Sequence, residues 1–323
     1  MQRNDALMRW ASAATCARFD LGRARAWRVL WCAIGAATLL SACAVSSGAA
    51  NTSFRVGERE DRGEIQAREL TEASGIAASR INPGVFWVHN DSGDSNRVFA
   101  VGPDGRDRGR FVVQGCPARD WEDIAVGPGP NEGQSYLYIG DIGDNRASWK
   151  SIVVCRVAEP VIPTPSSLQP VVLRDVTVLR LKYPDRPHNA ETLMVDALTR
   201  DLYVVTKQDR VARVYVAPYP YDEQQTTRMI FVTELPMAAI AAGDIAPDGR
   251  RILLKDLGNI WMWERAPGST VAQALSTAPT RLRYIREPLG EGVAWSADGR
   301  GYVTVSERVF GLVPHLYFYP ELP

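Results

Sequence analysis

The sequence predicts an all-β fold, a single β-propeller built from repeated four-stranded sheets. Three observations support this prediction. Apolar runs are short and are separated by turns rich in the chain's 26 glycines and 21 prolines, which favours strands over long helices. A short motif recurs five times along the 323 residues. Asp-Gly pairs at 248–249 and 298–299 suit tight hairpin turns, because both residue types tolerate positive φ.

The recurring motif marks the first strand of each predicted unit. It reads EASGIA, WEDIA, AETLM, AGDIA and GEGVA, centred on Ile76, Ile124, Leu193, Ile245 and Val293. Successive centres are 48, 69, 52 and 48 residues apart. Because propeller blades repeat every 45 to 50 residues or so, the spacing favours five blades, with six as the alternative. The longer second spacing contains a proline-rich insertion at 160–170, which we expect to be a surface loop.

Three further strands are expected in most units. Second strands are predicted at Val85–Val88, Tyr136–Ile139, Leu202–Val205, Ile252–Leu254 and Tyr302–Val305. Third strands are predicted at Arg97–Val101, Ile152–Val157, Ala212–Ala217, Asn259–Glu264 and Leu316–Tyr319. Fourth strands are predicted at Arg110–Val113, Val176–Lys182, Met229–Thr233 and Arg281–Arg286. The last unit lacks a fourth strand, so we expect the N-terminal segment Gly63–Glu69 to supply it and close the ring.

The N-terminal segment is expected to direct export. Six arginines in residues 1–28 precede an apolar run at 29–42, which is too short to span a bilayer because about 20 residues are needed. The run ends in Leu40-Ser41-Ala42-Cys43, which resembles the lipobox of bacterial lipoproteins. The resemblance implies that residues 1–42 are a signal peptide and that Cys43 is lipidated. Residues 43–62 would then be a flexible linker and residues 63–323 the propeller.

These features predict where the protein resides. A lipid at Cys43 would tether it to a membrane without spanning it, because acyl chains anchor through buried CH₂ groups. We therefore expect an exported, membrane-anchored protein that faces the periplasm or the cell exterior, and a monomer. Loss of residues 1–42 removes six of 37 basic and two of 37 acidic residues, leaving a net charge of −4. This charge argues against a nucleic-acid-binding protein.

Two cysteines follow Cys43 in the chain. Cys116 precedes the hairpin that begins at Asp120, and Cys155 lies in the strand after that hairpin. An exported setting permits a disulfide between them, and two free buried thiols are the alternative. Neither cysteine is next to a histidine in the sequence, so a cysteine nucleophile is not expected.

Acidic residues gather where first strands begin and second strands end. In a propeller these points surround one mouth of the central channel, because the first strand lines the channel and the second returns beside it. The hairpin from Asp120 to Asn145 alone places five carboxylates at one end: Asp120, Glu122, Asp123, Asp141 and Asp144. Crowded carboxylates raise one another's pKa unless a cation or hydrogen-bond donors offset them. The alternative is a pair of solvated acidic turns.

Carboxylate-rich loops suit Ca²⁺, which takes six to eight oxygen ligands. The loops NDSGD and GDIGDN make Asp91, Asp94, Asp141 and Asp144 the candidate Ca²⁺ ligands. Zinc fits less well, since His89, His188 and His315 are widely spaced. Candidates for contacts to a small-molecule or polymer ligand at the mouth are Glu72, Asp120, Lys207, Asp244, Lys255 and Glu307. The two lysines either pair with Glu191 and Asp244 or attract a phosphate or carboxylate group.

The motifs SGIA, DWEDIA, GDIGDN, GDIAPDGR and EGVAWSADGRGY resemble a group of exported bacterial propeller proteins. They are more loosely similar to calcium-dependent propellers of the gluconolactonase and phytase-like kind. The resemblance covers about residues 64–310 and implies the fold, but no complete catalytic set matches.

Two functions therefore remain open for this chain. The first is a binding or scaffold module. The second is a metal-assisted hydrolase of a phosphoester, lactone or glycoside, with Glu122, Glu191 or Glu291 as the acid or base. His89 is either a general base or a structural residue. Two unpaired carboxylates about 5 to 10 Å apart across an open pocket would favour glycoside chemistry, whereas acids paired with lysine would favour the binding module.

Overall fold

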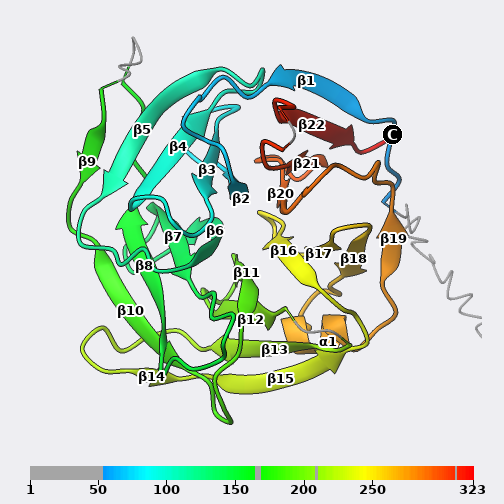
Figure 1. The fold of residues 1–323 in the computed structure, drawn as a ribbon. Helices are drawn as coiled ribbons and strands as arrows, with labels where there is room; N and C mark the ends of the chain where they lie inside the picture. The colour runs from blue at the N-terminus through cyan, green and yellow to red at the C-terminus, as the bar shows by residue number, and fades with distance from the viewer. Residues whose placement is uncertain (1–53, 164–168, 208–209, 310) are drawn as a thin grey trace, which may run out of the picture. The chain divides into compact units, whose positions relative to one another are not determined.

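Five antiparallel sheets surround a common centre in the computed structural model (Figure 1). Their innermost strands are β2 (Ala73–Ala78), β6 (Trp121–Pro128), β11 (Ala190–Val195), β16 (Ile240–Ile245) and β20 (Gly292–Trp295). Each of these strands packs against the next, and β20 packs against β2, so the ring is closed. The fold is a five-bladed β-propeller, and the blade number favoured by the motif spacing is confirmed.

The structure describes residues 54–163, 169–207, 210–309 and 311–323, all within the unit Thr52–Pro323. The predicted signal peptide, Cys43 and the start of the predicted linker lie outside these residues. In the described ranges, no helix is long and apolar enough to cross a membrane.

The remaining strands follow in chain order within each blade. Blade 1 adds β3 (Phe86–Asn90), β4 (Arg97–Val101) and β5 (Asp107–Val113). Blade 2 adds β7 (Ser135–Asp141), β8 (Ile152–Ala158) and β10 (Thr177–Lys182). Blade 3 adds β12 (Leu202–Thr206), β13 (Ala212–Ala217) and β15 (Ile230–Leu235). Blade 4 adds β17 (Arg251–Asp256), β18 (Ile260–Glu264) and β19 (Thr280–Leu282), with the short helix α1 (Val271–Leu275) before β19.

Blade 5 contains β21 (Gly301–Val305) and β22 (His315–Pro320), and is completed by the N-terminal strand β1 (Glu60–Glu64). Closure by an N-terminal strand is confirmed, but the strand begins before the predicted Gly63–Glu69. Ile65, the first apolar residue of the predicted strand, is instead buried in the core after β1 ends. Phe54 packs edge-on against Trp295 with ring centroids 5.2 Å apart. The structure therefore places residues 54–62, expected in the linker, in or against blade 5.

Small residues allow the inner strands to approach one another at the centre of the ring. A Cβ atom on Gly243 would come within 2.7 Å of the Leu253 carbonyl oxygen and 2.9 Å of the Thr192 methyl group. A Cβ atom on Gly292 would come within 2.9 Å of the Ile76 side chain. Any larger residue at these positions would force neighbouring blades apart, because protein interiors have little free volume.

Two short strands connect neighbouring blades at their outer edges. After β8, the chain leaves blade 2 and β9 (Val171–Leu173) pairs in parallel with β5 of blade 1. Similarly, β14 (Thr227–Arg228) comes from blade 3 and pairs in parallel with β10 of blade 2. These parallel additions were not predicted. They make five-stranded sheets of blades 1 and 2 and link three consecutive blades through backbone hydrogen bonds.

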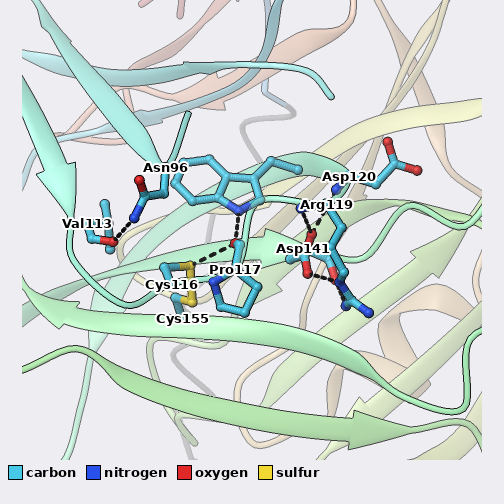
Figure 2. The surroundings of a disulfide bond; sticks show 9 residues. Asn96, Val113, Cys116, Pro117, Arg119, Asp120, Asp141 and Cys155 are labelled. Atoms are coloured by element: carbon cyan, nitrogen blue, oxygen red, sulfur yellow. Dashed lines mark hydrogen bonds and ion pairs between the residues drawn. A yellow bond between two sulfur atoms is a disulfide. The ribbon is translucent and has the colours of Figure 1, made fainter. Parts of the chain in front are cut away.

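A disulfide adds a covalent link between blades 1 and 2 (Figure 2). It joins Cys116, in the loop after β5, to Cys155 in the middle of β8. Both side chains are buried in one apolar cluster with residues of both blades, among them Phe111 and Leu137. The structure thus contains the bond that the sequence allowed, rather than two free thiols.

Candidate functional site

β-Bulges at the start of two inner strands position the acidic side chains of the mouth. The pairing of β6 with β7 shifts register between Trp121 and Asp123, and that of β11 with β12 shifts between Ala190 and Thr192. Glu122 and Glu191 are the extra residues at these two points. A bulge interrupts the strict alternation of side chains and redirects the extra residue. Both glutamates are consequently buried at the same end of their blades as the rim loops.

Three carboxylates from blades 1 and 2 form a compact acidic cluster. Asp91 follows β3, whereas Asp120 and Glu122 lie at the start of β6, and one oxygen from each lies within 4.8 Å of the others. The Glu122 side chain is only 3% exposed. Among the described residues, no hydrogen-bond donor or cation is within bonding distance of the Glu122 carboxylate. Such a carboxylate is costly to bury, because it loses most of its hydration and gains no protein donor in exchange.

Gly143 makes room for this cluster. A Cβ atom at this position would lie 2.2 Å from Glu122 Oε1 and 2.5 Å from Asp120 Oδ2. The Gly143 amide also donates to the Asp120 carbonyl oxygen at 3.1 Å, which holds the glycine backbone against the start of β6. The loop GDIGDN was predicted to bind through its aspartates, but its second glycine, Gly143, is the residue that lies against the cluster.

Lys207, which follows β12 of blade 3, interacts with two further glutamates at the mouth. Its Nζ atom is 2.7 Å from Glu191 Oε2 in blade 3 and 3.9 Å from Glu291 Oε1 in blade 5. The Lys207 side chain remains about one-third exposed, whereas both glutamates are largely buried. Side chains from blades 1, 2, 3 and 5 therefore interact around one opening.

The mouth carries an excess of negative charge. Burial, followed by the charges of Glu191, Asp91 and Asp120, raises the pKa of Glu122 well above its ordinary value. Burial also raises the pKa of Glu291, although Lys207 opposes the shift. The pKa of Glu307 is raised to about 7 by burial and by the charges of Glu291, Asp91 and Glu72. A cation at the cluster would reverse these shifts, because it favours the ionised carboxylates.

Three of the four predicted Ca²⁺ ligands are instead occupied by protein donors. Asp141 accepts hydrogen bonds from the Arg119 and Asp120 amides, both at 2.8 Å, and from Arg119 Nε at 2.6 Å, as Figure 2 shows. Asp144 accepts from the Ser148 and Trp149 amides, both at 2.6 Å. These acids organise the backbone of the rim.

The Asp94 carboxylate interacts with side chains instead of backbone amides. It accepts from Asn90 Nδ2 at 2.6 Å and forms an ion pair with Arg97 at 2.8 Å. Of the four predicted ligands, only Asp91 joins the cluster.

Two of the predicted ligand-binding residues use their side chains for contacts within the protein. Asp244 accepts a hydrogen bond from the Trp295 amide at 2.9 Å and so connects β16 to β20. Its pKa is raised to about 6 by burial, although Arg80, which follows β2, lowers it. Lys255 is fully buried and donates to the carbonyl oxygens of Gly290 and Asp256. Neither side chain presents a free polar group to the mouth.

His89 is also enclosed. The ring has no exposed surface, its Nδ1 atom is 2.7 Å from the Asn90 carbonyl oxygen, and it packs edge-on against Trp121. Burial lowers its pKa, which keeps the ring neutral. The position fits the structural alternative better than the general base.

Glu72 and Glu307 complete the predicted set. Glu72 is exposed at the start of β2, and its backbone carbonyl accepts a hydrogen bond from the Asp91 amide at 2.8 Å. Its charge contributes to the raised pKa of Glu307, so the two glutamates share the edge of the opening.

Comparisons with known proteins assign no family to the chain. No protein-family model matches the chain, and no curated protein matches its sequence. Among solved structures, the chain is similar to the β-propeller domain of Cps50 (Swd1) from Myceliophteria thermophila. The two are 10% identical with a TM-score of 0.39, over 77% of this chain and 84% of that one. At this level the likeness supports no functional argument.

Proposed function

We propose that the propeller is a ligand-binding module whose mouth holds a Ca²⁺ ion on Asp91, Asp120 and Glu122. The observation behind the proposal is the group of three carboxylate oxygens within 4.8 Å of one another, one of them from a buried glutamate that has no donor among the residues the structure describes. Ca²⁺ binds oxygen at 2.3–2.6 Å, so two ligands of one ion lie at most about 5 Å apart. The spacing of the three side chains satisfies this limit.

The ligand would bind across the opening between the ion and Lys207. Three carboxylates leave several of the six to eight Ca²⁺ positions open to water or to oxygen atoms of a ligand. Lys207, from the neighbouring blade 3, offers a partly exposed side chain with an ammonium group. Together, a metal ion and a lysine attract an anionic oxygen group, which makes a phosphate or carboxylate on a small molecule or polymer the best-matched ligand.

The pairing of the glutamates favours binding over hydrolysis. Glu191 and Glu291 share Lys207, so neither is a free acid or base facing an open pocket. One observation supports a metal-assisted hydrolase as a second candidate: the raised pKa of Glu122 keeps this carboxyl protonated at neutral pH, as a general acid requires. A screen of phosphoester, lactone and glycoside substrates with Ca²⁺ would separate the two functions.

The ion is tested by calorimetry and thermal melting of the purified full chain. We expect Ca²⁺ to bind and to raise the melting temperature, EDTA to reverse the effect, and Glu122→Gln or Asp91→Asn to abolish it. Glu132→Gln, the same chemical change on an exposed turn, is the matched control and should respond like the unmodified chain. A melting temperature indifferent to both Ca²⁺ and EDTA would remove the ion from the proposal.

We also propose that the protein is exported and anchored through a lipid on Cys43. The disulfide between Cys116 and Cys155 supports export, because such bonds persist in oxidising compartments. Mass spectrometry of the N-terminal peptide tests the lipid directly. Cys43→Ser should release the protein from the membrane fraction, and unchanged membrane association would contradict the anchor.

A further inference from the structure

The disulfide between Cys116 and Cys155 lies close to the acidic cluster along the chain. Residues 114–120 form the loop that leads from β5, the last strand of blade 1, to β6, the inner strand of blade 2. Asp120 ends this loop, and Glu122 is the second residue of β6. Because Cys155 is fully buried on β8, the central strand of its sheet, the disulfide attaches the loop to a rigid part of blade 2.

Hydrogen bonds hold the loop between the disulfide and the start of β6. Trp121 Nε1 donates to the Pro117 carbonyl oxygen at 2.6 Å. The Arg119 and Asp120 amides donate to Asp141 Oδ1, both at 2.8 Å (Figure 2). The loop is therefore attached near both of its ends, by a covalent bond at the first and by hydrogen bonds at the second.

The same loop also supports the third carboxylate of the cluster. Ala118 and Trp121 line one small recess together with residues 90–95, the segment that contains Asp91. The Trp121 ring also packs edge-on against His89 of β3, with ring centroids 5.6 Å apart. Displacement of the loop would therefore affect all three carboxylates.

A metal ion binds more tightly to ligands that are already in place. Ligands that must be ordered on binding lower the affinity, because the entropy lost in ordering them opposes binding. When ionised, three carboxylates within 4.8 Å of one another also repel, so any movement of the loop that separates them is favourable before the ion binds. A covalent attachment beside the cluster opposes this separation.

We propose that the disulfide between Cys116 and Cys155 positions the carboxylates of the mouth for Ca²⁺, so that a chain without the bond binds the ion more weakly. The inference rests on the proposed Ca²⁺ site. The cysteines do not contact the ion in this arrangement. They act through the loop that carries Asp120 and leads to Glu122.

Isothermal titration of the purified full chain with CaCl₂ tests the proposal, with the double variant Cys116→Ala/Cys155→Ala. Both cysteines lie in an apolar cluster, so alanine removes the bond without burying a polar group. We expect the double variant to bind Ca²⁺ at least about tenfold more weakly than the unmodified chain, as is usual when residues that support metal ligands are changed.

Val157→Ala is the matched control for the double variant. It removes apolar volume from the same cluster, on the same strand as Cys155, and leaves the disulfide intact. It should lower the melting temperature and leave the Ca²⁺ affinity unchanged. An equal loss of affinity in this control would overturn the proposal, because general loosening of blade 2 would then explain the effect.

A second variant tests the loop with the disulfide intact, and decides the question if the double variant does not fold. Trp121→Phe keeps an aromatic ring and removes the donor to Pro117, so Ca²⁺ binding should weaken by about fivefold, the scale of one neutral hydrogen bond. Unchanged affinity in the folded variants would overturn the proposal, since the hydrogen bonds to Asp141 alone would then hold the loop. Absence of Ca²⁺ binding by the unmodified chain would instead overturn the Ca²⁺ site itself, and this inference with it.

Discussion

Asp141 and Glu122 are buried carboxylates on paired strands of the same blade, and their surroundings differ sharply. Asp141 accepts two backbone hydrogen bonds and one from Arg119. The Glu122 carboxylate has no donor within the part of the chain that the structure describes, and it lies against two other carboxylates. Hydrogen bonds and an ion pair offset the desolvation of Asp141, whereas burial of Glu122 is unfavourable until a cation arrives. Burial alone therefore does not identify a ligand-binding acid. The absence of hydrogen-bond donors around a buried carboxylate is the distinguishing feature.

The largest effect on the free energy of unfolding is expected at Asp141, whose carboxylate accepts hydrogen bonds from the protein. Asp141→Ala removes a buried carboxylate that pairs with Arg119 and orders the amides before β6. Arg119 is partly exposed and can be hydrated, but two backbone amides lose their acceptor at about 1 to 3 kcal/mol each, so the free energy of unfolding should fall by about 2 to 5 kcal/mol. Urea denaturation measures it, with exposed Glu132→Ala as the control. A loss below about 1 kcal/mol would mean that the hydrogen bonds to Asp141 stabilise the fold little, and that Asp141 and Glu122 do not differ as proposed.

The unpartnered acids should control the pH dependence of stability. Because folding raises the pKa of Glu122 and brings that of Glu307 to about 7, the folded state holds more protons than the unfolded state above about pH 4.5. In EDTA, the free energy of unfolding should therefore fall as the pH rises, by up to about 1.4 kcal/mol per pH unit through the buried Glu122 and by less through the partly exposed Glu307, whose charge solvent screens.

Ca²⁺ should flatten this decline, because the bound ion favours the ionised carboxylates. The stabilisation by Ca²⁺ should thus be larger at pH 8 than at pH 5, as measured by chemical denaturation at both values. If Ca²⁺ raised the free energy of unfolding by the same amount at both pH values, the ion would be bound by acids with ordinary pKa values.

Gly143→Ala sharpens the comparison by closing the space beside Glu122. The new Cβ atom would overlap Glu122 Oε1 and Asp120 Oδ2, so one carboxylate must move away. We expect a loss of about 1 to 3 kcal/mol in the free energy of unfolding, as for other overpacked sites, together with loss of the Ca²⁺ response. Thermal melting with and without Ca²⁺ checks both effects. A retained Ca²⁺ response would place the ion elsewhere.

The smallest effect is expected at Asp94, an acid of the rim loop that pairs with Arg97 on a partly exposed surface. Asp94→Asn should cost less than about 1 kcal/mol, because exposed ion pairs contribute little. The Ca²⁺ response should be unchanged in calorimetric titrations. If this variant lost Ca²⁺ binding, the loop aspartates would be the ligands after all.

Strand order was predictable because each blade is built from local segments. The motif centred on Ile124 and the run Tyr136–Ile139 needed only a short turn between them to pair. Because the same pattern occurs five times, strands that were uncertain in one unit could be recognised from the others. The closing strand was misplaced because Ile65 is apolar, as strand residues usually are, but it belongs to the core beyond β1. Nothing in the pattern near Gly63 distinguishes these two ways of burying an isoleucine.

The assignment of acids was less predictable. The alternation of Asp141 and Asp144 with glycine in GDIGDN predicted Ca²⁺ ligands, but both side chains accept hydrogen bonds from backbone amides, of residues 119–120 and 148–149 respectively. Such donors depend on turn geometry that residue types alone do not specify. The bulge at Glu122 and the space at Gly143 likewise arise from backbone register.

The amino-acid sequence by itself determined the β-strand content, the five repeats and the gathering of acidic residues at one end of the blades, because these follow from local periodicity. Only the tertiary structure decided which carboxylates are satisfied and which remain unpaired. Lys207 reaches Glu191 and Glu291 from different blades, and Asp91 meets Glu122 across a blade boundary. Such contacts exist only once the ring has closed and has brought distant segments within hydrogen-bonding range.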